Sequence, residues 1–136
     1  MNKSLRERIR LKYGGKCAYC GCDLPARWHV DHVEAVLRKT TYVQGKGFQS
    51  TGETWKPQND REDNLMPACV QCNLHKTTHS LEFWREEIRM QIARLTKRSS
   101  GYRIAKAFGL ITETGEPVRF YFEQFDHPRI TNEQQV

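Results

Sequence analysis

Two Cys-x-x-Cys pairs restrict the possible folds of this chain more than any other feature of its sequence. Cys17 and Cys20 form the first pair, Cys69 and Cys72 form the second, and 48 residues lie between them. Two such turns separated by a folded insert can bring four thiolates to one tetrahedral Zn²⁺. Zinc binding in a small domain supplies ~10 kcal/mol or more of folding free energy, comparable to the net stability of a whole domain. We therefore expect a structural zinc site that joins the first pair to the start of a helix at the second.

A fifth cysteine, Cys22, lies two residues after Cys20 and could substitute as a ligand. We leave Cys22 out of the expected site, because an extra cysteine beside a zinc-binding turn is usually a bystander. Four cysteine ligands fill the tetrahedral coordination of zinc and leave no open position for a substrate. Any chemistry must therefore be carried out by other residues.

Length and composition indicate a single soluble domain of modest core size. The chain has 136 residues, of which 38% are hydrophobic. No run approaches the ~20 apolar residues that a membrane span requires, so no membrane partner is expected. Residues 1–6 contain no apolar stretch of the signal-peptide kind. We therefore expect a cytoplasmic protein, in which paired cysteines bind metal rather than form disulfides.

The charge balance is basic but leaves two interpretations open. Lys and Arg number 22 against 16 Asp and Glu, a formal net charge of +6. The plain interpretation is a solvated basic surface. The sharper one is a polyanionic partner, whose phosphates would be neutralised by lysines and arginines.

Hydrophobic periodicity predicts an α+β fold. Strands are expected over residues 28–35 and 64–67, and a helix over 70–77. The residues between the two strands, 38–60, are broken up by glycines, so we expect a long basic loop that could contain a hairpin. Further along the chain we expect a helix over 81–97, a short helix over 102–108 and a strand over 118–122. The longest helix would pack through a stripe of apolar residues: Leu81, Trp84, Ile88, Ile92 and Leu95.

An acid, a histidine and two amides lie inside and beside this cysteine frame. The carboxylate of Asp31 suits Mg²⁺ or Mn²⁺, and the imidazole of His32 suits proton abstraction from water. Asn73 directly follows Cys72, where its amide oxygen could be a second metal ligand. An Asp-His pair alone is weak evidence. The pair followed by Asn64-Leu65 and then by Cys-x-x-Cys-Asn-x-x-Lys is far more specific.

This pattern resembles the HNH endonuclease family, and its zinc-binding subset in particular. The resemblance covers about residues 5–95 and implies a ββα-metal finger held by the four-cysteine zinc site and flanked by helices. It implies that Asp31 binds the catalytic metal, that His32 is the general base and that Asn64 braces the loop around His32. Asn73, where many relatives have the last histidine, would be the second metal ligand of an H-N-N variant. A nuclease core would then occupy residues 1–98, and a small helix and strand extension residues 99–136, frayed after about 126.

The implied activity is metal-dependent hydrolysis of DNA phosphodiesters, by nicking or by double-strand cleavage. The zinc would be structural, and one Mg²⁺ or Mn²⁺ would be catalytic. The DNA is expected to be double-stranded, and the protein to be a monomer or a homodimer. Lys76 and His29 are candidate phosphate contacts, although a solvated lysine and a surface histidine are equally simple interpretations. The compact form is similar to HNH proteins of bacteriophages and prophages, which places it in a bacterial or phage-infected cell.

Two departures from the family pattern bear on the metal. Thr77 is not the histidine that some relatives use one turn further along the helix, and Glu34-Ala35-Val36 replaces the usual proline after the Asp-His pair. Oxygen ligands favour Mg²⁺ or Mn²⁺ over zinc or nickel. The alternatives are a non-catalytic zinc-stabilised module that binds nucleic acid, and a zinc-stabilised adaptor for another protein. Neither alternative requires Asp31, His32 and Asn73 together.

Overall fold

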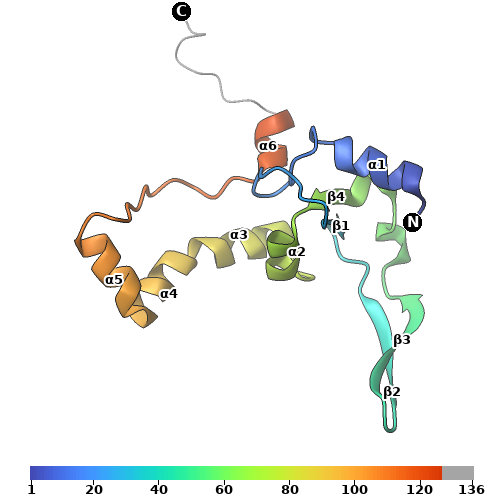
Figure 1. Ribbon diagram of the computed structural model, residues 1–136. Helices are drawn as coiled ribbons and strands as arrows, with labels where there is room; N and C mark the ends of the chain where they lie inside the picture. The colour runs from blue at the N-terminus through green and yellow to red at the C-terminus, as the bar shows by residue number, and fades with distance from the viewer. Residues whose placement is uncertain (127–136) are drawn as a thin grey trace, which may run out of the picture. The chain divides into compact units, whose positions relative to one another are not determined.

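Contacts within the chain divide it into two units (Figure 1). The computed structural model describes residues 1–126. One unit contains Met1–Ser80 together with 120–126 of the described residues, and the other contains Leu81–Arg119. Helices and two small antiparallel sheets make up these units, which confirms the predicted α+β class. Among the described residues, no helix has the length and apolar character that crossing a bilayer requires.

The first unit is built from four strands, three α-helices and two short 3-10 turns within its described residues. The strands are β1 (His29–His32), β2 (Arg38–Val43), β3 (Gly47–Thr54) and β4 (Leu65–Ala68). The helices and turns are α1 (Lys3–Leu11), η1 (Pro57–Asn59), η2 (Glu62–Asn64), α2 (Val70–Lys76) and α6 (Tyr121–Asp126).

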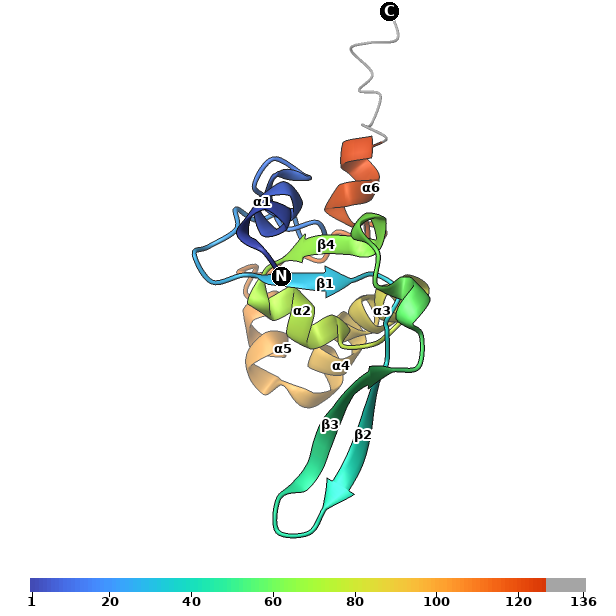
Figure 2. The ribbon, with the colours of Figure 1, turned by 90° about the vertical axis from the view of Figure 1, so that its right-hand side faces the viewer.

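A two-stranded sheet and the helix that follows it form the centre of this unit (Figure 2). Strand β1 pairs antiparallel with β4, so that Asp31 lies opposite Met66 and His32 opposite Leu65. Helix α1 contacts β4, and α2 contacts β1. The buried core joins Ile9 of α1 to Trp28 and Leu65. The two predicted strands and the helix that begins at the second cysteine pair are therefore confirmed: β1 and α2 are shorter than predicted, and β4 is shifted by one residue.

A β-hairpin, which was one of the possibilities left open for the long loop over residues 38–60, occupies most of that segment. Strands β2 and β3 pair from Val43 opposite Gly47 back to Arg38 opposite Thr54, with an irregularity near Lys39. Gly45 and Gly47 have φ values of 83° and 77°, a conformation that glycine adopts without strain. The glycines that suggested a loop therefore mark the hairpin turn. The β-branched and aromatic residues beside them form the strands.

The predicted strand over residues 118–122 is wrong. Phe120 is buried, and α6 begins at the next residue. The backbone N–H groups of Tyr121 and Phe122 donate to the carbonyls of Tyr19 and Ala18, at 2.9 and 2.8 Å. The segment is thus fixed by the first cysteine turn and not by a strand partner. The predicted fraying after about residue 126 lies outside the described residues.

The second unit contains three helices: α3 (Leu81–Arg89), α4 (Gln91–Arg98) and α5 (Ser100–Ala107). The single helix predicted over 81–97 is interrupted at Met90. Its apolar stripe is only partly buried, because Trp84 is 2% exposed whereas Ile92 and Leu95 are each 42% exposed. The predicted helix over 102–108 is confirmed as α5. Ser99 caps α5 by accepting a hydrogen bond from Tyr102 N at 3.1 Å, and Gly109 follows it with a φ of 73°.

Candidate functional site

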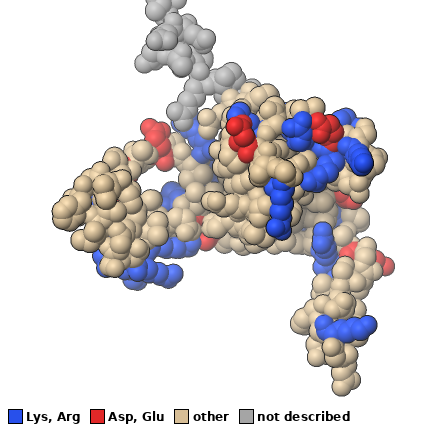
Figure 3. Space-filling model, viewed as in Figure 1, with Lys and Arg blue, Asp and Glu red and all other residues tan. Residues whose placement is uncertain are grey.

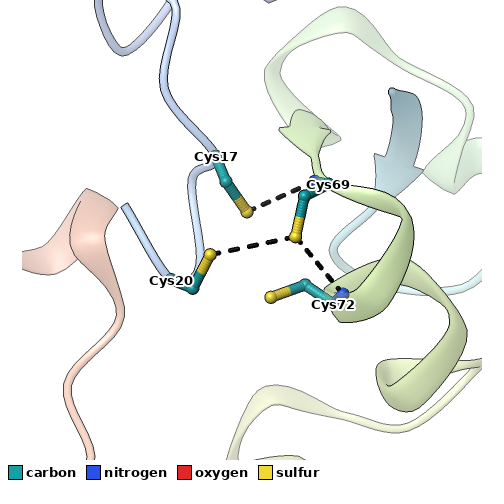
Figure 4. Close-up of side chains that lie close together, drawn as sticks. All are labelled: Cys17, Cys20, Cys69 and Cys72. Carbon is teal, nitrogen blue, oxygen red and sulfur yellow. Dashed lines mark hydrogen bonds between the residues drawn. The ribbon is translucent and has the colours of Figure 1, made fainter. Parts of the chain in front are cut away.

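The four cysteines of the two pairs converge on one point (Figure 4). The sulfur atoms of Cys17, Cys20, Cys69 and Cys72 all lie within 4.8 Å of one another. Cys20 Sγ and Cys69 Sγ are 3.8 Å apart, and a tetrahedron with Zn–S bonds of about 2.3 Å has edges of about 3.8 Å. Among residues 1–126, this is the one group of three or more Cys, His, Asp or Glu side chains arranged to hold a metal ion. The donor set fits a structural zinc.

Local backbone structure explains why both pairs present their sulfur atoms. The first pair lies on a turn in which Gly21 N donates to Cys17 O at 3.0 Å, and Gly21 adopts a φ of 79°. The second pair begins α2, where Cys69 Sγ accepts from Cys72 N at 3.5 Å. A second N–H donor to sulfur is that of Cys69, which donates to Cys17 Sγ at 3.4 Å. N–H donors of this kind stabilise thiolates, the form that binds metal.

Of these thiols, Cys17 is favoured as a thiolate, whereas burial raises the pKa of Cys20 and the hydrogen bond to Cys17 raises the pKa of Cys72. A hydrogen bond from the Cys72 thiol, together with backbone N–H donors that include Cys69, lowers the pKa of Cys17 to about 4. The fifth cysteine, Cys22, is exposed and is not a member of the four-sulfur group. Its exclusion from the expected site agrees with this arrangement.

Asp31 lies on β1 and is almost completely buried, with 8% of its surface exposed. The Tyr19 hydroxyl donates to Asp31 Oδ2 at 2.5 Å, and Lys76 Nζ lies 3.1 Å from the same oxygen. Burial, and then the neighbouring Asp31 carboxylate, raises the pKa of Tyr19, so its hydroxyl remains a donor. Both contacts use Oδ2, which leaves Oδ1 as the carboxylate oxygen that a metal could approach.

Lys76 does not occupy the position expected of a phosphate contact. Its side chain is completely buried, and Nζ also donates to the backbone carbonyl of His32 at 3.0 Å. A buried ammonium needs such partners, because its transfer out of water is otherwise very costly. Lys76 therefore joins α2 to β1 from inside the unit and is not available to a ligand at the surface.

A cavity of about 740 Å³ opens beside this ion pair. Asp31, His32 and Asn73, the three residues predicted to act on a metal and a water, all line it, and so does His29. The complete lining is His29, Val30, Asp31, His32, Ala35, Val36, Leu37, Arg38, Trp55, Asn73, Thr77 and Thr78. Strand β1, the start of the hairpin and the end of α2 thus enclose one space.

His32 has a carboxylate partner that the sequence did not indicate. His32 Nε2 lies 2.9 Å from Asp60 Oδ1, and the imidazole is 27% exposed. If Nε2 carries the proton and donates to Asp60, Nδ1 is the nitrogen with a free lone pair. In that arrangement the pair orients the ring and leaves Nδ1 as the nitrogen that can accept a proton.

Asn64 is buried and holds the loops around His32. Its Nδ2 donates to Glu34 O and Asn59 O, at 2.8 and 2.7 Å, and its Oδ1 accepts from Glu34 N at 3.0 Å. One of these carbonyls belongs to Asn59, the residue before Asp60. The amide thus connects the chain after β1 with the turn that supplies the carboxylate to His32.

Backbone strain coincides with this cavity. Among the described residues, the non-glycine positions with positive φ are Leu37, at 55°, and Thr77, at 51°. Both line the cavity. Residues held in such conformations cost of order 1–3 kcal/mol each and tend to cluster at active sites and ligand sites. The strain is consistent with a functional cavity.

Sequence reasoning missed Tyr19, Asp60 and the hairpin residues Arg38 and Trp55. Tyr19 lies between two predicted zinc ligands, and its position next to Asp31 depends on the cluster being closed. Asp60 is 28 residues from His32 in the sequence, and no motif connects the two. Their contributions are visible only in three dimensions.

Comparisons with known proteins identify no relative. No protein-family model matches the chain, and neither the curated proteins nor the solved structures contain a match.

Proposed function

We propose that this protein is a metal-dependent DNA endonuclease of the HNH type, with a structural zinc at the four cysteines. The observation that carries the proposal is that Asp31, His32 and Asn73 line one cavity on a strand–strand–helix unit fastened by those cysteines. A carboxylate, an imidazole and a carboxamide on one cavity wall are the groups that metal-assisted hydrolysis requires. The order β1, β4, α2 also agrees with the ββα-metal finger that the sequence pattern resembles.

The oxygen donors suit Mg²⁺ or Mn²⁺ in the cavity. Asp31 Oδ1 and the side-chain oxygen of Asn73 would hold the ion, with water completing its coordination. His29, on the same cavity wall, is a further candidate for a ligand or a phosphate contact. When bound, the cation would neutralise charge that develops on the phosphate and on the leaving oxygen.

His32 would act as the general base. Its Nδ1 takes a proton from a water molecule, and the water oxygen forms a bond to phosphorus as the bond to the leaving 3′ oxygen breaks. The leaving oxygen is then protonated from solvent. Asp60 accepts from Nε2–H throughout and stabilises the imidazolium that forms. Asn64 and Lys76 position these groups and do not contact the phosphate.

The basic residues of α1 give little support to the alternative of a module that only binds nucleic acid. Arg8 pairs with Glu62 at 2.9 Å, and Arg10 pairs with Glu7 at 2.7 Å. The guanidinium of Arg6 lies 4.0 Å from the ring centre of Trp28. Figure 3 accordingly shows acidic side chains among the basic ones over α1. Much of the positive charge on this helix is already neutralised or packed.

Plasmid cleavage tests the proposal directly. The zinc-loaded protein should convert supercoiled plasmid to nicked or linear forms with Mg²⁺ or Mn²⁺, and EDTA should stop the reaction. His32→Ala should keep the zinc content and the circular dichroism spectrum but lose cleavage by about a hundredfold or more. His75→Ala, which changes an exposed histidine of α2 outside the cavity lining, is the matched control and should cleave normally. Binding of DNA without cleavage would favour the non-catalytic module.

A further inference from the structure

We propose that the β2–β3 hairpin is a nucleic-acid-binding arm whose aromatic pair, Tyr42 and Phe48, stacks on unpaired bases. The inference rests on the proposed nuclease function and narrows its substrate to DNA with a single-stranded segment beside the cleaved bond.

The pair consists of two large apolar side chains that face water. Tyr42 and Phe48 are directly opposite each other in the hairpin, with ring centres 5.5 Å apart and ring planes at 72°. They are 65% and 76% exposed. Their edge-to-face geometry leaves ring surface open for a further aromatic group. A two-stranded hairpin is only marginally stable alone. Two large exposed rings on such a hairpin indicate a surface that is covered by a binding partner.

The hairpin is continuous with the candidate active site. Arg38, the first residue of β2, lines the cavity together with Asp31 and His32. Trp55, directly after β3, lines it as well, and its backbone N donates to Leu37 O at 2.8 Å. A strand whose phosphate lies in the cavity would therefore leave it along the hairpin.

The net positive charge of the hairpin favours binding of a polyanion. Residues 38–56 contain four basic side chains, Arg38, Lys39, Lys46 and Lys56, against the single acid Glu53. Lys46 lies in the turn next to the aromatic pair, and Lys39 Nζ lies 4.6 Å from the ring centre of Trp55. In Figure 3 basic side chains lie along this projection, at the lower right, and most of its end is uncharged. Proteins that bind single-stranded nucleic acid combine cations with exposed rings: the cations contact the phosphates, and the rings stack on the bases.

Stacking on unpaired bases fits the rings better than contact with an intact duplex. In a duplex the base faces are covered by their neighbours, and only groove edges are available. An unpaired base exposes both faces, and stacking on an aromatic side chain is tolerant of sequence. At about 3.3 Å per strand residue, Tyr42 is roughly 13 Å along β2 from Arg38. A base stacked on the rings would therefore be a few nucleotides from a phosphate held in the cavity.

The test compares three DNAs of one sequence: a single strand, a blunt duplex and a duplex with a single-stranded overhang. All proteins carry His32→Ala so that the DNA survives, and binding is followed by fluorescence anisotropy. The single strand and the overhang should bind more tightly than the blunt duplex. Tyr42→Thr/Phe48→Thr removes both rings but keeps residues that favour strands, and should weaken binding to the first two DNAs at least tenfold. Tyr42→Phe keeps both rings and should bind as the parent does.

A 2-aminopurine base in the overhang gives a second measurement. Its fluorescence should respond most strongly to the parent protein when it lies within a few nucleotides of the scissile bond, beside the aromatic pair. The response should be lost in Tyr42→Thr/Phe48→Thr and kept in Tyr42→Phe. An unchanged preference for unpaired DNA in the double variant would overturn the hairpin inference.

Three further outcomes are decisive. If the wild-type protein cleaves plasmid and overhang DNA, and the double variant does so with the same KM, the nuclease proposal survives and the hairpin inference fails. If the wild-type protein neither binds nor cleaves any of the DNAs, the nuclease proposal itself fails. If sedimentation shows a wild-type dimer that the double variant cannot form, the rings belong to an interface between two copies and the inference is overturned.

Discussion

The ammonium of Lys76 lies 3.1 Å from Asp31 Oδ2, in an ion pair whose lysine is completely buried. Lys76 Nζ also contacts the carbonyl of His32, so one side chain of α2 holds two consecutive residues of β1. The proposed metal ligand and the proposed general base therefore share a support that lies outside the reacting groups.

Removal of that support should destabilise the protein. Lys76→Met leaves Asp31 buried without its counter-charge, and breaking a buried pair in this way costs about 3–5 kcal/mol. Urea unfolding of the zinc-loaded protein measures the loss. Lys3→Met, at an exposed lysine of α1, should change the free energy of unfolding by no more than about 0.5 kcal/mol. Equal effects of the two substitutions would contradict an internal role for Lys76.

Asp60→Asn tests the orientation of His32. An amide can no longer stabilise the imidazolium through a charged partner, so kcat should fall by about tenfold to a hundredfold with little change in KM. Steady-state cleavage of an oligonucleotide separates the two constants. Asp63→Asn, three residues further along and 77% exposed at the side chain, is the control and should leave kcat unaffected. A rise in KM alone would mean that Asp60 contributes to binding instead.

Substitution of single cysteines should distinguish the proposed zinc ligands from Cys22, which is not expected to bind zinc. Cys69→Ser should lose zinc, measured by mass spectrometry of the bound metal, and should unfold or melt at a much lower temperature. Cys22→Ser should retain one zinc per chain and a normal melting temperature, because Cys22 lies outside the four-sulfur group. Loss of zinc in Cys22→Ser would mean that Cys22 is a ligand and would contradict the proposed ligand set.

The Arg8–Glu62 pair, which joins α1 to η2, should make stability depend on pH in the acid range. The hydrogen bond from Arg8 lowers the pKa of Glu62 below its ordinary value of 4.5. A lowered folded-state pKa means that the contribution is present above pH 4.5 and is lost as the pH falls through the lowered value. The stability difference between wild type and Glu62→Gln should therefore be present near pH 7 and vanish in stronger acid. Because both side chains are half-exposed, added salt should reduce it. Glu116→Gln is the control at an exposed position.

The cysteine spacing was sufficient to predict the metal cluster, because the ligands of each pair are separated by one local turn. Asp31 and His32 were likewise predicted as neighbours on a strand and Asn73 as part of a helix, and the structure has them in β1 and α2. These predictions depend on residues that lie near one another in the sequence. For that reason they could be made without knowledge of the tertiary fold.

Other sequence patterns fitted more than one structure. The aromatic run at 118–122 alternates as a strand does, but hydrogen bonds to Ala18 and Tyr19 start a helix there instead. The glycines of residues 38–60 suggested a long loop that could contain a hairpin, and Gly45 and Gly47 lie in and beside the turn of the hairpin that forms there. Short patterns of this kind are decided by which backbone partner is near, and the sequence does not contain that information.

The amino-acid sequence by itself determined the four sulfur ligands and the acid, imidazole and amide groups around them. Only the tertiary structure decided that Lys76 is internal, that Tyr19 donates to Asp31 and that Asp60 meets His32. The physical reason is that burial and long-range pairing depend on the packing of segments distant in the chain. A lysine, a tyrosine or an aspartate looks the same in the sequence whether it faces water or a buried partner.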